Sequence, residues 1–334
     1  MVELFNHLLD HARTSFGVKF LLSPLYLGAT VLIVWFVWVA RKRPGGDFLR
    51  YMLPKELYLH PSTRVDIQVA LVNTAFAATG IFAVLALTPA VTHEVLNWLS
   101  ALGGRLAPED AGPVRAILGG AILFLAQDFC RYWNHYLHHE TRVLWPFHAV
   151  HHSAEVMTPI TFLRAHPMYS ILQALMIGAV VGIVQAVILF VLIGQIGWTT
   201  IMTSTLAFNA YVFFGAHLRH SHIWVSYGRR LEHILISPAQ HQIHHSSDPR
   251  HHDRNYGEVF AIWDWMFGTL YVPDGPEDLT YGLADGEGRM IPQKHPTLKD
   301  AMLFPFVEAW EEITRGTGWA RPAEGERPDT AAGR

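Results

Sequence analysis

Three histidine triplets with identical spacing are the residues of this sequence best suited to chemistry. The pattern H-x-x-H-H occurs at His135, His138 and His139, at His148, His151 and His152, and at His241, His244 and His245. On a helix these positions share one face, so the imidazoles of a triplet should point the same way. Neutral imidazole is the commonest protein metal ligand, and about nine that converge exceed what one ion can hold. The spacing therefore predicts a site for two metal ions.

Two simpler interpretations compete with metal binding, because histidine clusters can also be pH sensors or solvated surface patches. The remaining composition narrows the kind of metal site. Cys130 is the only cysteine, which argues against a disulfide framework and against zinc or iron–sulfur sites held by cysteines. The sequence contains neither a Glu-x-x-His pair, typical of di-iron carboxylate bundles, nor the H-E-x-x-H motif of zinc proteases. A metal site here must be built from histidine nitrogens.

The overall composition is that of a membrane protein. Apolar residues make up 51% of the chain and charged residues 16%, whereas ordinary soluble domains have about 25% charged residues. The formal net charge is -3 at pH 7, and no basic stripe with interleaved aromatic residues occurs. These features argue against a nucleic-acid partner.

Long uncharged stretches predict an all-α, polytopic membrane bundle of about five spans. The first three spans cover roughly residues 20–40, 65–89 and 113–127. Residues 171–216 contain neither a charged residue nor a histidine, and the sequence Gly194-Gln195-Ile196-Gly197 near their middle predicts two helices joined by a tight turn. Residues 298–313 are interpreted as an amphipathic segment on the membrane, in which Pro305 argues against a continuous helix.

The distribution of basic residues predicts the orientation of the bundle. Residues 41–64 carry six lysines and arginines, whereas residues 90–112, a polar stretch, carry only Arg105. By the positive-inside rule the first segment is cytoplasmic and the second external. Five spans with an external N-terminus then place every histidine triplet in a cytoplasmic helical cap. The N-terminus lacks the order of a cleaved signal peptide, so we expect a retained first span in an integral protein of the bacterial inner membrane.

The chain divides into three parts by composition. Residues 1–19 form an N-terminal segment, residues 20–314 one membrane domain, and residues 315–334 a tail expected to be disordered. The histidine-rich part of the domain covers residues 128–271.

Further motifs surround the triplets. Asp128 and Tyr132 precede the first triplet in the pattern D-x-x-x-Y-x-x-H-x-x-x-H, and the second triplet lies in L-W-x-x-H-x-x-H-H-S. An R-x-H-P element begins at Arg164, and Pro238 precedes the third triplet. Beyond it stand Asn255-Tyr256-Gly257, Trp263-Asp264 and Phe267-Gly268-Thr269. With these motifs, residues 128–271 resemble the membrane fatty-acid hydroxylase and sterol desaturase family, whose members are integral-membrane di-iron proteins.

The resemblance implies a ligand set and two supporting carboxylates. The expected iron ligands are His135, His139, His148, His151, His152, His220, His241, His244 and His245. Asp128 and Asp264 would accept the hydrogen bonds that fix the tautomers of ligand histidines. A helix cap, or an ion pair with Arg131 or Arg254, is the alternative interpretation of each carboxylate.

The sequence departs from the family pattern at three places. Tyr136 stands where the first box usually has arginine, and His220-Ser221-His222 stands where the family often has H-S-N. His138 is additional to the usual first box and is expected to lie just outside the ligands or to face solvent. The roles of His217 and His222 stay open.

The other conspicuous side chains receive structural interpretations. The histidines in this class are His166, His251 and His252. The tryptophans Trp145, Trp263 and Trp265 are expected at the membrane interface rather than in the chemistry.

The resemblance also implies an activity. A pair of iron ions would activate O2, and hydrogen would be abstracted from an unactivated C–H bond of a lipid, with hydroxylation or desaturation as the result. The substrate could be a sterol, a fatty acyl chain, a carotenoid or an ether lipid. Electrons must come from a separate protein of the ferredoxin or cytochrome b5 kind, because the sequence has no haem-attachment or flavin-binding motif.

Two functions from other classes remain as alternatives. A membrane metal-ion carrier or sensor would pass ions along the histidines, but it would need polar residues deep within the spans, and residues 171–216 offer none that ionise. A bis-histidine haem protein would leave most of the histidines without a role.

Overall fold

The computed structural model describes residues 24–79, 87–104, 106–108, 111–317 and 319. Its regular elements are helices, and the described residues form isolated β-bridges but no β-strand, which confirms the all-α prediction. The predicted segment 1–19 and most of the predicted tail 315–334 lie outside the described residues.

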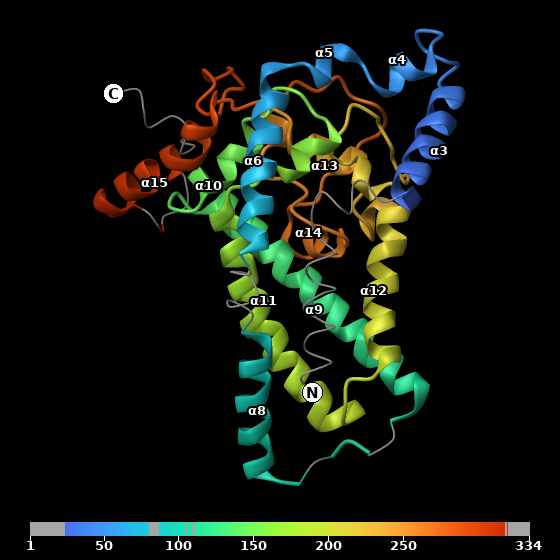
Figure 1. Cartoon of the computed structure of the whole chain (residues 1–334), viewed down its shortest axis with the longest axis vertical. Coiled ribbons are helices and arrows are strands. Elements are labelled where there is room, and N and C mark those ends of the chain that lie inside the picture. The colour runs from blue at the N-terminus through green and yellow to red at the C-terminus, as the bar shows by residue number, and fades with distance from the viewer. Residues whose placement is uncertain (1–23, 80–86, 105, 109–110, 318, 320–334) are drawn as a thin grey trace.

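Four long helices form the lower part of the molecule (Figure 1). They are α8 (Thr88–Leu102), α9 (Gly112–Glu140), α11 (Pro167–Ile188), which continues into a π-helical turn (Leu189–Ile193), and α12 (Trp198–Phe213). Helix α11 packs against both α8 and α9, and α12 packs against α9. Glycines allow close approach: a Cβ on Gly120 would lie 2.5 Å from the Thr200 carbonyl oxygen, and one on Gly182 would lie 2.7 Å from the Val91 side chain.

Two described helices are long and apolar enough to cross a membrane, namely α9 and the combined helix Pro167–Ile193. A shorter apolar helix covers Leu27–Ala40 within α3 (Pro24–Ala40). The predicted break at residues 194–197 is confirmed, because Gly194 has φ 69° and α12 begins at Trp198. The count of five spans remains a prediction.

Residues 80–86, which belong to the predicted span over residues 65–89, lie outside the described residues, so the end of this span remains a prediction. Helix α6 (Pro61–Ala78) covers the described first part of the span, and α8 occupies much of the stretch 90–112 that was expected to be an external connection. Helix α6 packs against η1 (Pro159–Leu163) and α15 (Leu298–Thr314), beside the histidine-rich part. Helix α8 packs along α11, where the Thr92 hydroxyl donates to the Gly182 carbonyl over 3.0 Å. Packing on the glycines of α11, which hydropathy does not record, thus holds α8 against the bundle.

Helices α6 and α15, together with a set of short helices, form the upper part of the molecule, which we call the cap (Figure 1). Besides α6 and α15, its elements are α4 (Phe48–Met52), α5 (Lys55–Tyr58), α10 (Trp145–His152), η1, η3 (Ala216–Leu218), η4 (Leu231–His233), α13 (Pro238–His244), η5 (Pro249–His251) and α14 (Ile262–Phe267). The basic segment 41–64 lies at this end of the molecule (Figure 1), the end that also holds α10 and α13.

Helix α15 corrects the expectation at Pro305. The helix is continuous from Leu298 to Thr314 with the proline inside it, and the Thr297 hydroxyl caps it by accepting from Asp300 N. Pro305 is itself buried, so packing against the cap supports the helix where the proline lacks an N–H. Its outer side chains are apolar and exposed, namely Leu303, Phe304, Phe306, Val307, Trp310 and Ile313. This pattern suits the predicted membrane-surface position, which remains a prediction.

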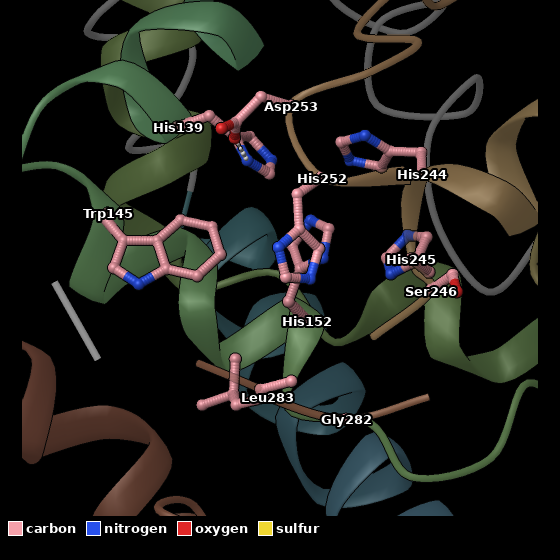
Figure 2. Close-up of a pocket in the computed structure, with 11 residues that line it drawn as sticks. His139, Trp145, His152, His244, His245, Ser246, His252, Asp253, Gly282 and Leu283 are labelled. Carbon is pink, nitrogen blue, oxygen red and sulfur yellow. Dashed lines mark ion pairs between the residues drawn. The ribbon is translucent and has the colours of Figure 1, made fainter. Parts of the chain in front are cut away.

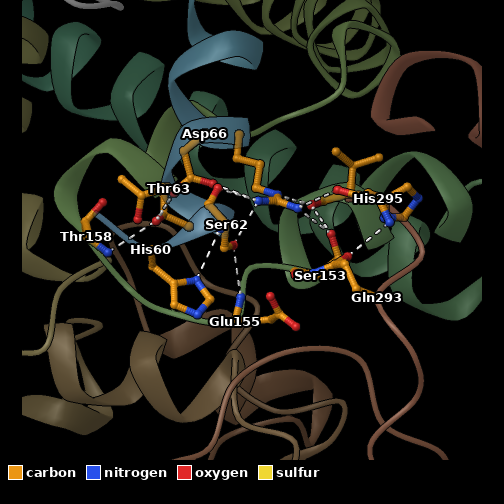
Figure 3. Close-up of polar contacts among 12 residues, drawn as sticks. His60, Ser62, Thr63, Asp66, Ser153, Glu155, Thr158, Gln293 and His295 are labelled. Carbon is orange, nitrogen blue, oxygen red and sulfur yellow. Dashed lines mark hydrogen bonds and ion pairs between the residues drawn. The ribbon is translucent and has the colours of Figure 1, made fainter. Parts of the chain in front are cut away.

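A fully buried arginine ties the cap together. The Arg164 guanidinium donates to the Asp66 carboxylate on α6 over 2.9 Å, to the Val150 carbonyl of α10 over 2.8 Å, and to the Ser153 hydroxyl over 2.9 Å. Figure 3 shows Asp66, Ser62 and Ser153 in this polar cluster. Burial makes the contact sensitive to the loss of one partner, because the other charge is then left without compensation.

We expect Arg164→Met to lower the free energy of unfolding by about 3–5 kcal/mol, since it leaves the Asp66 carboxylate buried without its cation. The matched control is Arg229→Met, which breaks an ion pair with Asp274 whose side chains are 78% and 92% exposed. An exposed pair contributes about 0–1 kcal/mol. Thermal unfolding of the detergent-solubilised protein measures both variants, and equal unfolding temperatures for them would contradict this account.

Candidate metal centre

The candidate ligands come from one long helix, two short helices and a loop. His135 and His139 lie on the cap end of α9, the second triplet lies on α10, the third lies at α13, and His220 follows η3. Proline at the first turn favours the start of both short helices. Helix α13 has in addition a capping box, in which the Ser237 hydroxyl accepts from Gln240 N and the Gln240 side chain accepts from Ser237 N.

The nine predicted ligands form two adjacent groups. Group A consists of His135, His139, His148, His152 and His244, and group B consists of His151, His220, His241 and His245. Within each group the potential ligand nitrogens all lie within 4.8 Å of one another. All nine residues are buried. The structure thus brings together every histidine that the sequence nominated as a ligand.

The triplets do not point in a single direction as the spacing had suggested. In α10, His148 and His152 belong to group A and His151 to group B; in α13, His241 and His245 belong to group B and His244 to group A. Helical geometry explains the division. At about 100° per residue, positions i and i+4 differ by about 40°, whereas position i+3 lies about 60° to the other side of position i. One two-turn helix can therefore serve two metal positions.

The nitrogens of group B have the spacing of metal ligands. The Nε2 atoms of His151 and His220 are 3.0 Å apart, those of His220 and His241 are 2.9 Å apart, and those of His241 and His245 are 3.2 Å apart. Ligands about 2.1 Å from one ion lie about 3.0 Å apart at right angles and about 3.4 Å apart in a tetrahedron. The observed distances fit a single first-row metal ion.

Group A has a similar arrangement with five rings. The Nε2 atoms of His148 and His152 are 3.2 Å apart, and the rings of His135 and His244 are 4.5 Å apart. The Nε2 atoms of His135 and His244 are buried and have no hydrogen-bond partner among the described residues. Burying an unsatisfied polar nitrogen is costly, and a metal ion would use its lone pair. The donor set of both groups therefore fits metal binding.

Burial keeps the imidazoles neutral, which is the form that binds metals. Burial, followed by the neighbouring histidines, lowers the pKa of His152 and His245 well below the usual histidine value. The pKa of His151 falls to about 3, chiefly through burial and then through the Arg164 charge. Near neutral pH these rings carry no charge, so protons do not compete for their lone pairs. A cluster of pH-sensing histidines would need pKa values near 6 or 7.

Backbone carbonyls orient two ligands of group A. The Nδ1 atom of His135 donates to the Tyr256 carbonyl over 2.8 Å, and Nδ1 of His244 donates to the Arg254 carbonyl over 2.7 Å. Because a carbonyl only accepts, the proton must be on Nδ1 and the lone pair on Nε2, which faces the group.

Asp128 and Asp264 do not accept directly from the ligand histidines, so the role predicted for them is wrong in its direct form. Asp128 accepts from Val259 N, Phe260 N and Trp263 Nε1 over 2.9–3.1 Å. Asp264 accepts from Tyr256 N, Gly257 N and the Thr269 hydroxyl over 2.6–2.8 Å. Their carboxylates satisfy the N–H groups of the loop around residues 256–260, so they act on the ligands one step removed.

The histidines whose roles were open lie outside both groups. His138 is fully buried, which contradicts a solvent-facing position, and its Nδ1 donates to the Asn134 carbonyl over 2.7 Å. His217 contacts the Thr30 hydroxyl and the Val212 carbonyl. His222 donates to the Tyr51 carbonyl over 2.8 Å.

The histidines interpreted as structural or surface residues make such contacts. His166 caps α11 by accepting from Met168 N, and His251 lies 3.0 Å from the Glu277 carboxylate. His252 donates to the Ser247 carbonyl.

Trp145 is a site residue that the sequence argument misplaced. It is buried, and its ring centroid lies 5.0 Å from that of His139 and 5.5 Å from that of His152, so the predicted position at the membrane interface is wrong for it. Trp145 follows Leu144 directly before the second triplet, and this L-W pair is the sequence signal that could have placed Trp145 near the ligands. Trp265, by contrast, is 67% exposed.

A partly open pocket lies beside group A in the cap (Figure 2). Three ligands of group A and one of group B line it, namely His139, His152, His244 and His245. Trp145, Asp253 and Leu283 lie at its other walls, and Figure 2 shows Asp253 beside His139. Asp253 had not been singled out in the sequence.

Comparison with known protein families matches the part of the chain that carries these motifs. The fatty acid hydroxylase family model matches residues 120–269. The chain is 32% identical to human (Homo sapiens) alkylglycerol monooxygenase over 203 residues, 59% of this chain and 41% of that protein. It is 29% identical to the ornithine lipid hydroxylase of Rhizobium tropici over 156 residues, 47% of this chain and 43% of that protein. It is 25% identical to the Delta(7)-sterol-C5(6)-desaturase of Nicotiana tabacum over 255 residues, 74% of this chain and 82% of that protein.

The chain therefore spans less than half the length of the first two relatives. No solved structure matches it significantly. The three relatives are named as a monooxygenase, a hydroxylase and a desaturase, and each of these names describes an oxidoreductase. The matched region contains every member of groups A and B. Residues 120–269 of this chain thus match the fatty acid hydroxylase family model, the family that its motifs resemble.

Proposed function

We propose that the protein is an integral-membrane, O2-dependent di-iron oxidoreductase that hydroxylates or desaturates a C–H bond of a lipid. The observation that carries the proposal is the pair of adjacent, buried groups of neutral imidazoles within the family region. The names of the relatives support a lipid substrate, since they refer to an alkylglycerol, an ornithine lipid and a sterol.

The residues of groups A and B would hold one iron ion each. When bound, such a pair supplies the electrons and the open positions with which O2 is activated. The protein's own contribution is to hold the imidazoles neutral, to orient His135 and His244 through backbone carbonyls, and to keep water away by burial. A separate electron-transfer protein, of the ferredoxin or cytochrome b5 kind, would complete each turnover.

The position of the ligands on α9 supports a substrate that arrives from the lipid. One helix carries an apolar stretch long enough to cross a membrane and then His135 and His139 near its end, so the site lies next to the apolar bundle. A lipid chain could reach the site without crossing water. Whether the substrate is a sterol, a fatty acyl chain, a carotenoid or an ether lipid depends on the shape of the space between these helices.

The two alternative functions fit the geometry less well. An ion carrier needs successive polar positions along a path, whereas the nine imidazoles form one compact cage. A bis-histidine haem needs space for a macrocycle between two facing imidazoles. Neighbouring Nε2 atoms only 2.9–3.2 Å apart leave no such space.

The first test concerns iron content and activity. Protein purified from iron-replete cells should contain about two iron atoms per chain. His151→Ala and His244→Ala should lose iron, and lipid extracts of cells that express them should lose the species shifted by one oxygen or by two hydrogens. Elemental analysis and lipid mass spectrometry measure these outcomes.

His233→Ala is the matched control, since His233 is exposed and donates to the Arg229 carbonyl away from both groups. It should keep both the iron and the lipid product. Membrane fractionation checks that every variant is still inserted. Active wild-type protein without a transition metal would refute the proposal.

The second test concerns topology. With Cys130 buried, the protein offers little background to thiol reagents, so single cysteines can report sidedness. Arg250→Cys, at a 70% exposed side chain on the cap, should react from the cytoplasm alone. Gln195→Cys, in the turn at the opposite end of the bundle, should react from outside alone. Labelling with a membrane-impermeant maleimide, on intact cells and on inverted vesicles, distinguishes the two sides.

Labelling of both positions from the same side would exclude an odd number of crossings between the cap and this turn. The predicted orientation would then have to be abandoned.

A further inference from the structure

The two groups differ in the support that their outer nitrogens receive. Residues 253–256 contact three of the five rings of group A. The Asp253 carboxylate lies 3.8 Å from Nδ1 of His139, and the carbonyls of Arg254 and Tyr256 accept from His244 and His135. One four-residue segment thus faces the outer nitrogens of most of group A.

Group B lacks an equivalent segment. Its Nε2 atoms face inward, and the Nδ1 atoms of His220, His241 and His245 have no hydrogen-bond partner among the described residues, although they are buried. The backbone of Thr161 approaches His151, but the geometry at Nδ1 of His151 is not that of a hydrogen bond. Among the described residues, no hydrogen bond at Nδ1 orients His220, His241 or His245.

The 253–256 segment is held rigidly from outside. Asn255 donates from its backbone N–H to the Thr269 carbonyl, donates from its side chain to the Gln240 carbonyl, and accepts from Tyr271 N. The Asp264 carboxylate holds the N–H groups of residues 256 and 257.

An unusual backbone conformation also marks the segment. Asp253 and Asn255 both adopt φ 59°, a conformation that non-glycine residues rarely take. A conformation of this kind persists only where surrounding contacts enforce it, and it is concentrated at functional positions.

The lining of the pocket also favours group A. Three rings of group A but only one ring of group B line the pocket of Figure 2. Group A therefore supplies most of the imidazoles at this pocket.

We propose that residues 253–256 make the two metal positions unequal, so that group A takes the first iron ion and holds it more tightly than group B does. This inference rests on the proposed function, because it presumes that both groups bind iron. Hydrogen bonds to the outer nitrogens of ligand histidines typically change metal affinity by 10–100-fold, since they fix the ring and raise its basicity. Group A also offers five nitrogens against four.

Variants with a single intact group test the order directly. His220→Ala/His245→Ala leaves group A whole, and His135→Ala/His139→Ala leaves group B whole. We expect the first variant to bind one Fe²⁺ at least about tenfold more tightly than the second. Anaerobic Fe²⁺ titration of the full-length protein in detergent, followed by calorimetry, measures both affinities without reference to activity. Equal affinities, or tighter binding by group B, would overturn the inference.

Asp253→Asn tests the segment itself. The amide keeps the size of the side chain and tolerates the left-handed backbone, but it removes the charge that faces His139. We expect the first Fe²⁺ to bind about tenfold more weakly and the second to change little. Asp274→Asn, at a 92% exposed carboxylate, should change neither step.

The possible outcomes separate the two proposals. Wild-type protein that binds no Fe²⁺ would refute the proposed function together with this inference. Two ions bound with the order reversed, or a first step that Asp253→Asn leaves unchanged, would refute the inference alone. An unchanged unfolding temperature for Asp253→Asn in the metal-free form shows that the variant is folded.

Discussion

The burial of neutral imidazoles with their lone pairs facing one another is the constraint on which the rest of the cap depends. Nitrogens of group B approach to 2.9–3.2 Å, and several outer nitrogens have no partner among the described residues. Each unsatisfied buried polar group costs about 1–3 kcal/mol. The polypeptide must hold this arrangement against that cost. Contacts that are costly to lose, such as the buried Arg164–Asp66 pair, therefore surround the cage.

The supporting contacts form layers. Asp128 lies on α9, before Arg131 and the first ligand, His135. Its carboxylate accepts from Val259 N and Phe260 N and so ties α9 to the loop around these residues. Asp264 ties the same loop to its own helix through Tyr256 and Gly257. Since the Tyr256 carbonyl orients His135, a hydrogen bond at Asp264 influences a ligand nitrogen without touching it. The carboxylate thus holds the loop in place, and the loop fixes the orientation of the imidazole.

Much of the site could be predicted from sequence because its signals are local. The triplet spacing nominated the nine clustered histidines, and glycines placed the turn at residues 194–197. The missed features depend on tertiary packing. Helix α8 is defined by its contact with the glycines of α11, Pro305 is accommodated by burial, and Trp145 turns toward His139 rather than toward lipid. The carbonyls of Arg254 and Tyr256 carry no sequence signal at all, since every residue has a carbonyl.

The division of the triplets explains why His138 and His220 both depart from the pattern. Helices α10 and α13 each give positions i and i+4 to one group and position i+3 to the other. Helix α9 gives His135 and His139 to group A, and the same rule would send His138 to a second group. His138 instead donates to the Asn134 carbonyl and packs against Tyr169 with ring centroids 4.6 Å apart, where α11 leaves its cap end. Because α9 continues into the apolar bundle, its i+3 face is occupied by α11, and the loop after η3 supplies His220 to complete group B. The division into five and four ligands follows from α9 and α10 giving their i and i+4 pairs to group A while α13 gives its pair to group B, and His220 fills the place in group B that His138 leaves.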